Sequence, residues 1–364
     1  MKKLIFFLLI MLVACSPVKE KIFVANEASG SISVIDAGLL EEIGRISLTA
    51  KHEGARVEYA PHNVQVVGDK VLVTANIAHK ESESGEHGDH EMAAVDMEIP
   101  IGIIAVAAHG EEETEHEDHP DQLVIIDAKS HKIAKRIDLD IGAHLAHVVS
   151  DGAYAYVTAT NNELLYKVNL ATGNYFPVIL PKGSMPHGIR LTADNKTAII
   201  AGMTGYLLLV NLETKNITTI KLPGKGVQAG VAGDYAMASV FDTRQLALYD
   251  MKTQELSFVD LTNAKGPIQM YPTPDNNYVY IADQGVYFDQ PPGRNTYKID
   301  LAEKKVVAVI DTGDAPHGVV VSPDGRVWVT NLNGNTVSVI QNDSKIKEIE
   351  VGASPNGISY WNKS

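Results

Sequence analysis

A unit of about forty residues repeats along this chain, and the repeat limits the possible folds more than any other feature of the sequence. It is clearest after Pro186-His187-Gly188 and after Pro316-His317-Gly318, where short runs rich in Val, Ile, Tyr and Thr are separated by Asn, Asp and Gly. Such runs are typical of β-strands joined by turns. No long stretch outside the N-terminal segment has the apolar period of a helix. The period matches a four-stranded propeller blade, so an all-β propeller is expected.

The first position of the repeat recurs seven times, which predicts a seven-bladed β-propeller with four-stranded blades in one domain, residues 21–364. The recurring positions are 62, 147, 187, about 228, 268, 317 and 356. In six units an Asx residue suited to a tight turn follows the third strand. These residues are Asp36, Asp127, Asn169, Asn211, Asp250 and Asp300.

The first and last units are incomplete in complementary ways. Residues 22–25 and 32–35 lack a preceding first strand, whereas only one strand, residues 358–361, follows Pro355-Asn356-Gly357. The C-terminal strand is therefore expected to complete the N-terminal blade. A ring closed in this way has no exposed sheet edges, which are a hazard for all-β proteins.

The repeats resemble the YVTN family of propellers, to which YncE-like proteins belong. The resemblance is carried by Tyr156-Val157-Thr158-Ala159, Val329-Thr330-Asn331 and Ser338-Val339-Ile340. It covers residues 21–364 and implies the seven-bladed fold. Because this fold supports many unrelated activities, function has to be argued from the site.

Four of the seven recurring positions hold a histidine, many more than chance predicts for 13 histidines in 364 residues. They are His62, His147, His187 and His317. Equivalent positions of a propeller meet near its axis, so these imidazoles are expected to converge and bind a metal ion. His62, His147 and His187 lie on consecutive blades and are the expected trio, and His144 is a further ligand or an orienting group. The alternative is that the histidines bond only to one another or to water.

Three imidazoles completed by water or a carboxylate suit Zn²⁺, with Cu²⁺ and Ni²⁺ as alternatives. The chain has one cysteine, Cys15, which argues against a site for Cu⁺. Zinc is therefore the expected ion.

A His/Asp/Glu-rich insertion, residues 77–120, is expected between the second and third strands of blade two. It holds thirteen acids, one base and six histidines, and its net charge of −12 is most of the −14 of the chain. Imidazoles and carboxylates together bind Zn²⁺, Ni²⁺ and Cu²⁺, so the insertion is a predicted metal-binding loop near the convergent histidines. A solvated loop without metal is the alternative. The candidate ligands are His87, Asp89, His90, His116, Asp118 and His119.

The N-terminus has the pattern of a bacterial lipoprotein leader. Met1-Lys2-Lys3 precedes an apolar run at residues 4–14, and Leu12-Val13-Ala14-Cys15 resembles a lipobox. We expect a signal peptide at residues 1–14, lipidation at Cys15 and a tether at residues 15–20. The protein is then anchored in the periplasm, at the outer membrane of a Gram-negative host, or otherwise on the outer face of the cell membrane.

The propeller repeats, the histidines and the His-rich loop together resemble the AztD-type periplasmic zinc chaperones. This resemblance implies a metallochaperone or metal store that serves the solute-binding protein of an ABC importer. A metal- or cofactor-dependent enzyme is one alternative, with residues 283–294 as part of a substrate pocket. A scaffold that binds protein or polysaccharide is the other. The acidic balance argues against nucleic acid, and a monomer is expected.

Overall fold

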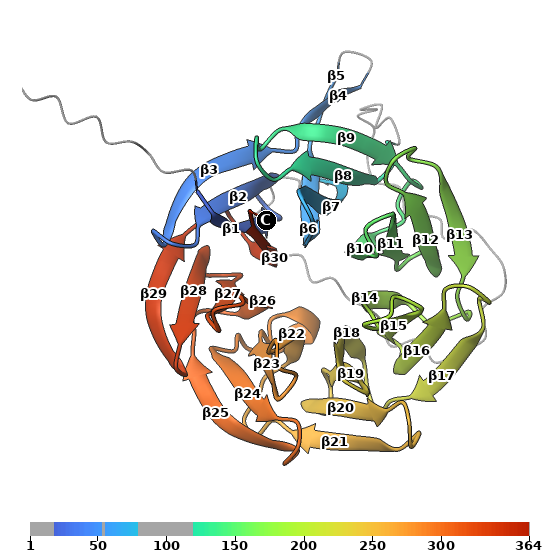
Figure 1. Cartoon of the computed structure of the whole chain (residues 1–364), viewed down its shortest axis with the longest axis vertical. Coiled ribbons are helices and arrows are strands. Elements are labelled where there is room, and N and C mark those ends of the chain that lie inside the picture. The colour runs from blue at the N-terminus through green and yellow to red at the C-terminus, as the bar shows by residue number, and fades with distance from the viewer. Residues whose placement is uncertain (1–17, 53–54, 79–118, 364) are drawn as a thin grey trace, which may run out of the picture.

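The structure is a computed structural model, and it describes residues 18–52, 55–78 and 119–363. Within these residues the strands form seven four-stranded antiparallel sheets, which are arranged in a ring with the first strand of each sheet near the axis (Figure 1). One further sheet is a two-stranded hairpin. The expected seven-bladed propeller is confirmed.

The blades are numbered along the chain, and their strands are given from the axis outward. Blade one is β30 (Pro355–Asn362), β1 (Glu20–Asn26), β2 (Ser31–Asp36) and β3 (Glu41–Ser47). Blade two is β6 (Tyr59–Val67), β7 (Lys70–Ile77), β8 (Gln122–Asp127) and β9 (Ile133–Asp138). Blade three is β10 (Leu145–Ser150), β11 (Tyr154–Ala159), β12 (Leu164–Asn169) and β13 (Tyr175–Ile179). Blade four is β14 (Pro186–Leu191), β15 (Thr197–Gly202), β16 (Tyr206–Asn211) and β17 (Ile217–Lys221).

The remaining blades follow the same order. Blade five is β18 (Gly226–Ala232), β19 (Tyr235–Val240), β20 (Gln245–Asp250) and β21 (Leu256–Asp260). Blade six is β22 (Pro267–Pro272), β23 (Tyr278–Asp283), β24 (Asn295–Asp300) and β25 (Lys305–Asp311). Blade seven is β26 (Pro316–Val321), β27 (Val327–Asn331), β28 (Thr336–Gln341) and β29 (Ser344–Glu350).

The C-terminal strand closes the ring, as the sequence predicted. β30 pairs antiparallel with β1, with Trp361 opposite Lys21 and Ile358 opposite Val24. Trp361 is buried in the apolar core between blades one and two. The two ends of the described chain are therefore held in one sheet.

The predicted Asx residues terminate the third strands and cap the turns that follow. Asp36 Oδ1 accepts hydrogen bonds from the backbone N–H groups of Gly38 (2.8 Å) and Leu39 (3.0 Å). Asx side chains make such bonds two and three residues ahead, which stabilises a tight turn without help from distant residues. The five equivalent Asx residues also accept from backbone N–H groups two or three residues ahead.

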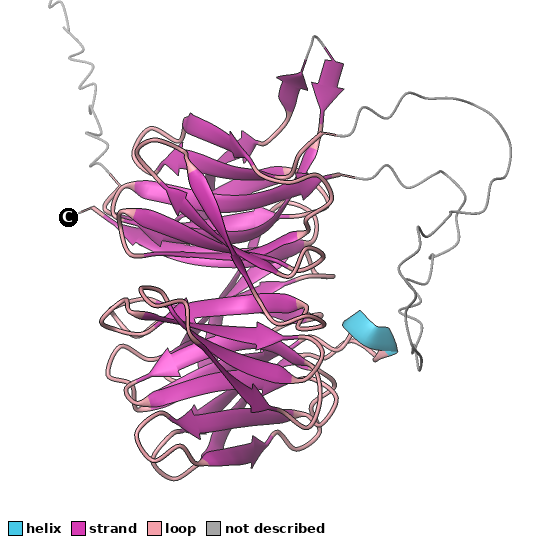
Figure 2. Ribbon diagram, turned by 90° about the vertical axis from the view of Figure 1, so that its right-hand side faces the viewer, coloured by secondary structure: helices cyan, strands magenta, loops and turns pink. Residues whose placement is uncertain are grey.

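Two elements depart from the repeat. The hairpin of β4 (Ala50–His52) and β5 (Ala55–Val57) projects between blades one and two, and the short 3-10 helix η1 (Tyr287–Asp289) joins the second and third strands of blade six (Figure 2). In blade two the second strand ends at Ile77 and the third begins at Gln122, so the insertion lies between them. No helix in the described part of the chain is long and apolar enough to cross a bilayer.

Candidate metal centre

Three of the recurring histidines share one structural position, at the start of an innermost strand. His62 lies in β6, His187 is the second residue of β14 and His317 is the second residue of β26. Their exposed fractions are 4%, 8% and 2%. At this position two residues of the innermost strand bulge out of the ladder in blades four and seven, so the side chain departs from the regular strand alternation.

His147 does not share that position, which corrects the alignment expected from sequence. A residue with positive φ precedes the innermost strand at Met185, Ala315 and Ser354, and in blade three this residue is His144. Counting from it, Ala146 is the equivalent of His187, and His147 is the equivalent of Gly188. The bulge falls at the equivalent place in blades three, four and seven, so the offset lies in the position of the histidine along the strand.

In blades four and seven the residue after the shared position has to be glycine, because a larger residue would clash with the next blade. Blade three has room for a side chain there. A Cβ on Gly188 would lie 2.0 Å from Gln228 Oε1, and a Cβ on Gly318 would lie 2.3 Å from the carbonyl oxygen of Asn356, each in the next blade. His147 occupies the same position and is wholly buried. Its ring centroid is 4.9 Å from that of His187, so its imidazole fills the space beside the next blade.

The tightest group of possible ligands is His62, His144 and His187, and not the predicted trio that contained His147. One ring nitrogen of each of these three residues lies within 4.8 Å of the others. It is the one group of three or more close metal-binding side chains found among the described residues. His144 joins because it immediately precedes β10 and its backbone N–H donates to Asp121 Oδ2 (3.0 Å).

The Nδ1 atoms of His62 and His187 each face an acceptor. His187 Nδ1 donates to the carbonyl oxygen of Val227 (3.0 Å), and His62 Nδ1 donates to Glu27 Oε1 (3.2 Å). A carbonyl and a carboxylate only accept, so both Nδ1 atoms carry hydrogen and both Nε2 atoms present a lone pair. Asn356 Nδ2 also lies 3.3 Å from His62 Nδ1, but it makes its shorter bond, 2.8 Å, to Glu27 Oε2. Metal-binding histidines are oriented in the same way by carboxylates and carbonyls.

The donor set fits a divalent borderline metal. His62 Nε2 is buried and has no hydrogen-bond partner within the described residues. A buried polar atom without a partner is costly unless a ligand satisfies it. Three neutral imidazoles suit Zn²⁺ and leave a fourth position for another ligand.

The electrostatic environment keeps His144 and His187 neutral and Glu27 ionised. Burial lowers the pKa of His144 to about 4, and burial together with the neighbouring histidines holds the pKa of His187 well below its usual value. Burial would raise the pKa of Glu27, but the charge of His62 and the hydrogen bonds from His62 and Asn356 lower it to about 2. Neutral imidazoles are the form that binds metal.

The two remaining predicted histidines lie next to this group without belonging to it. His147 Nδ1 and Nε2 are both buried and without partners in the described part of the chain, and its ring centroid is 5.8 Å from that of His62. His317 Nδ1 lies 3.2 Å from Gln284 Nε2, and its ring packs against Tyr287 with centroids 5.7 Å apart. Burial lowers the pKa of His317 to about 3 and holds that of His147 well below its usual value.

Most of the candidates in the insertion and at the N-terminus lie outside the described residues. These candidates are Cys15, His87, Asp89, His90, His116 and Asp118. His119 is described and is partly buried. The carboxylate of Asp121, two residues later, accepts from the N–H of Ile77 (2.9 Å) as well as from His144, so the base of the insertion contacts the candidate centre directly.

The sequence did not point to Glu27, Asn356 or Asp121. Glu27 Oε2 accepts from Asn356 Nδ2 (2.8 Å), which also lies 3.3 Å from His62 Nδ1. Asn356 occupies the shared position of blade one, so the repeat alone could have identified it. Glu27 and Asp121 lie between second and third strands, where the topology brings loops to the face that carries the histidines.

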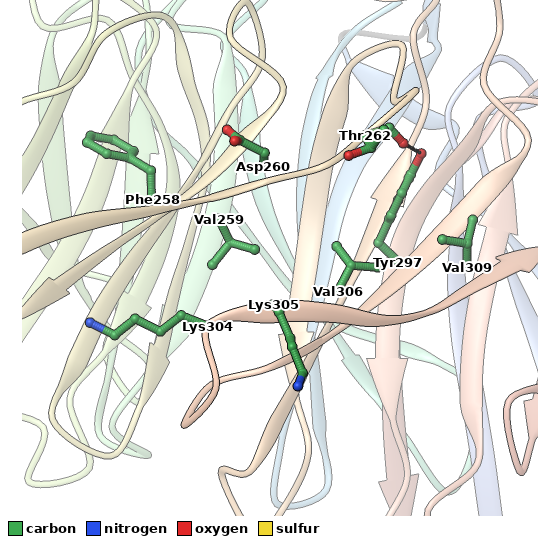
Figure 3. Close-up of a pocket in the computed structure, with 9 residues that line it drawn as sticks. All are labelled: Phe258, Val259, Asp260, Thr262, Tyr297, Lys304, Lys305, Val306 and Val309. Carbon is green, nitrogen blue, oxygen red and sulfur yellow. Dashed lines mark hydrogen bonds between the residues drawn. The ribbon is translucent and has the colours of Figure 1, made fainter.

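A surface hollow of about 400 Å³ lies away from this centre (Figure 3). It lies between the outer strands of blades five and six, β21 and β25, and Tyr297 at its wall donates to the carbonyl oxygen of Thr262 (3.0 Å). Asp260 is the only acid in its lining, which contains no histidine. A single carboxylate does not make a metal site, so this hollow is not a second candidate centre.

Comparisons with known proteins agree with the observed architecture. A family model described as YNCE-like beta-propeller matches residues 112–327, whereas the search of curated proteins finds no match.

Solved structures of low sequence identity share the fold. A virginiamycin B lyase from Staphylococcus aureus is 14% identical with a TM-score of 0.61, over 82% of this chain and 87% of that one. Hydrazine synthase from Kuenenia stuttgartiensis is 13% identical with a TM-score of 0.61, over 82% and 89%. A putative 6-phosphogluconolactonase from Bacteroides fragilis is 14% identical with a TM-score of 0.63, over 96% and 99%. Because the family match spans more than half of the chain, this protein belongs to the YNCE-like β-propeller family.

Proposed function

We propose that this propeller binds a divalent metal ion, zinc in the first place, through His62, His144 and His187. The convergence of three imidazoles within 4.8 Å, from three consecutive blades, is the observation that carries the proposal. The Nδ1 bonds of His62 and His187 support it because they leave the Nε2 lone pairs free to bind an ion.

The proposed role is that of a metallochaperone or metal store in the cell envelope. Lipidation at Cys15 would hold the propeller at a membrane, and the acidic, His-rich insertion would collect cations near the buried ligands. The proposed recipient is the solute-binding protein of an ABC metal importer. The contact of Asp121 with His144 supports a route from the insertion to the centre.

Metal titration of the soluble form that starts at Ser16 tests the proposal. The wild type is expected to hold a tightly bound Zn²⁺, and the triple variant His62→Ala/His144→Ala/His187→Ala is expected to lose it while the ring remains folded. Competition with a chromophoric chelator measures the affinity, and circular dichroism measures the fold.

The matched control is His131→Ala. His131 is remote from the candidate centre and contacts Lys21 Nζ (2.8 Å), so its removal should leave tight zinc binding unchanged. Tight binding that survives in the triple variant would contradict the proposed centre. Absence of tight metal in the wild type would contradict the function itself.

A metal-dependent enzyme is a second candidate, favoured by one observation. His317 and Tyr287 contact each other on the side of the centre where Glu27 interacts with both His62 and His317. A substrate bound to the metal would meet these groups. Turnover of ester or lactone substrates by the zinc-loaded protein, absent from the triple variant, would favour this candidate over a carrier.

A further inference from the structure

His317 is hydrogen-bonded in the opposite sense to His62 and His187. The backbone N–H of Tyr287 donates to Gln284 Oε1 (3.2 Å), which fixes the orientation of the Gln284 amide. The Nε2 atom of Gln284 then faces His317 Nδ1 at 3.2 Å. An amide nitrogen only donates, so His317 Nδ1 is an acceptor.

This arrangement fixes the tautomer of His317. A neutral imidazole that accepts at Nδ1 carries its hydrogen on Nε2. His317 therefore presents an N–H donor where His62 and His187 present lone pairs. The difference agrees with its absence from the group of three possible ligands.

The Nε2–H group of His317 has no acceptor within the described residues. The side chain is 2% exposed, so its polar groups depend on a bound partner or on water near the axis. Blade one separates His317 from His62, and there Asn356 binds Glu27 Oε2. Glu27 is therefore already hydrogen-bonded to His62 and Asn356, and in the described part of the chain no bond joins it to His317.

The charge balance of the centre favours an anion as the missing partner. Three neutral imidazoles do not compensate the two positive charges of Zn²⁺, and they leave a fourth position open. The carboxylate of Glu27 is committed to His62 and Asn356. A small anion bound to the metal would supply charge to the ion and an acceptor to His317.

We infer that the centre binds a small carboxylate together with the metal, and that His317 donates Nε2–H to its oxygen. The inference rests on the proposed metal binding and names the class of its co-ligand. It assigns His317 as a positioning residue, with Gln284 holding its tautomer. A hydrogen bond to a charged oxygen is stronger than a neutral one, which makes the donor selective for anions.

The tautomer is tested first, without metal, by long-range ¹H–¹⁵N spectra of the metal-free protein labelled at histidine. His317 is expected to show a protonated Nε2 and a bare Nδ1, whereas His62 and His187 show the reverse. A protonated Nδ1 on His317 would overturn the inference. This result does not depend on metal binding, so it is separable from failure of the proposed function.

Ligand binding is tested with acetate on the Co²⁺-loaded protein, read from visible absorption as the difference from the triple histidine variant. His317→Phe is expected to weaken acetate binding roughly tenfold, the size expected for one hydrogen bond to a charged group. The same variant should leave imidazole binding and Co²⁺ affinity unchanged, because imidazole needs no donor. His317→Gln, which retains an N–H donor, should restore most of the acetate affinity.

Three results would overturn the inference. Equal losses of acetate and imidazole would mean that His317 only shapes the space. A fall in the Co²⁺ affinity of His317→Phe would indicate that His317 binds the metal directly. Undiminished acetate binding in His317→Phe would show that His317 does not donate a hydrogen bond to the carboxylate. A wild type that binds no Co²⁺ would instead contradict the proposed function, while the tautomer result would still stand.

Discussion

Single hydrogen bonds to Nδ1 divide the buried histidines into two chemical kinds. His187 and His62 donate from Nδ1 to an oxygen, whereas the partner of His317 Nδ1 among the described residues is an amide nitrogen alone. The residue type is the same in each case, so composition and spacing do not reveal the division. The sequence predicted which blades carry the histidines. The group that bonds to each Nδ1, and so decides which ring nitrogen carries the hydrogen, comes from another blade or loop.

Replacing Glu27 by Gln should weaken zinc binding by roughly ten- to a hundredfold, the usual cost of losing a group that orients a metal-binding histidine. The amide keeps the size of the side chain but removes the charge that supports Nδ1–H of His62. Chelator competition measures the change. Glu42→Gln is the control because Glu42 pairs with Arg45 on the outer strand β3, and equal affinities in the two variants would contradict the role of Glu27.

Acidification should destabilise the metal-free protein as the pH falls below about 6.5, the ordinary pKa of histidine. Burial holds the pKa of His144 at about 4 and that of His317 at about 3. The unfolded chain therefore takes up protons first, and the free energy of unfolding falls until the folded-state pKa values are reached. Glu27, with a pKa of about 2, adds a further loss below about pH 4.5, because its carboxylate too is protonated first in the unfolded chain.

Urea unfolding at about pH 7.5 and about pH 5 measures this dependence, and a single pKa unit is worth about 1.4 kcal/mol when fully expressed. The double variant His144→Gln/His317→Gln should show a smaller difference between the two pH values. Stability that does not change over this interval would contradict the neutral, buried state of these histidines.

At the scale of strands, threonines in the second strands link neighbouring blades at the candidate centre. Thr158 Oγ1 accepts from the N–H of His147 (3.1 Å) and donates to the carbonyl oxygen of His187 (2.6 Å). Thr330 makes the same pair of bonds to Gly318 and Asn356. The Thr of the YVTN marker thus holds the start of two innermost strands, a role that the repeat pattern did not reveal.

The sequence comparison aligned β10 with the other innermost strands in the wrong register, by one residue. Blade three starts with Leu145-Ala146-His147 where blades four and seven have Pro-His-Gly, so matching histidine to histidine placed His147 one residue too early. The strands themselves were predictable because their composition and Asx turns are local signals. The contribution of His144 depends on a positive φ and on Asp121, which are properties of the folded loop.

Deleting residues 80–119 should lower the number of bound zinc ions but leave one tight site. The described ligands lie on blades two, three and four, and the ends of the deleted segment are joined by the bond from Ile77 N–H to Asp121. A short glycine linker can therefore replace the segment. Isothermal titration measures the stoichiometry, with an equal-length insertion free of His, Asp and Glu as the control. Loss of all binding would assign the site to the insertion.

At the scale of the whole molecule, the ring depends on the pairing of β30 with β1. Each blade buries its faces against two neighbours, and the core between blades one and two includes Trp361 from the last strand. Lys21 Nζ lies 4.8 Å from the centre of the Trp361 ring. Counting the repeat was enough to predict this closure, because seven units with complementary partial blades have one way to complete a ring.

Trp361→Ala should lower the free energy of unfolding by about 3–5 kcal/mol, the usual cost of removing a large buried aromatic side chain. Urea denaturation followed by circular dichroism measures the loss. Phe176→Ala is the control, because Phe176 is 62% exposed on the outer strand β13 and its loss should stay within about 0.5 kcal/mol. Similar changes in the two variants would contradict the role of Trp361 in closing the ring.

The separation of the three candidate ligands along the chain has a thermodynamic consequence. An ion held by His62, His144 and His187 cross-links segments that are far apart in sequence and lie on three separate sheets. Because these ligands meet only in the folded ring, an ion bound there would stabilise the folded state by mass action, and the gain would rise with the free metal concentration. The free energy of unfolding of the ring would then depend on the free concentration of the metal. A cell depleted of the ion would therefore also hold a less stable protein.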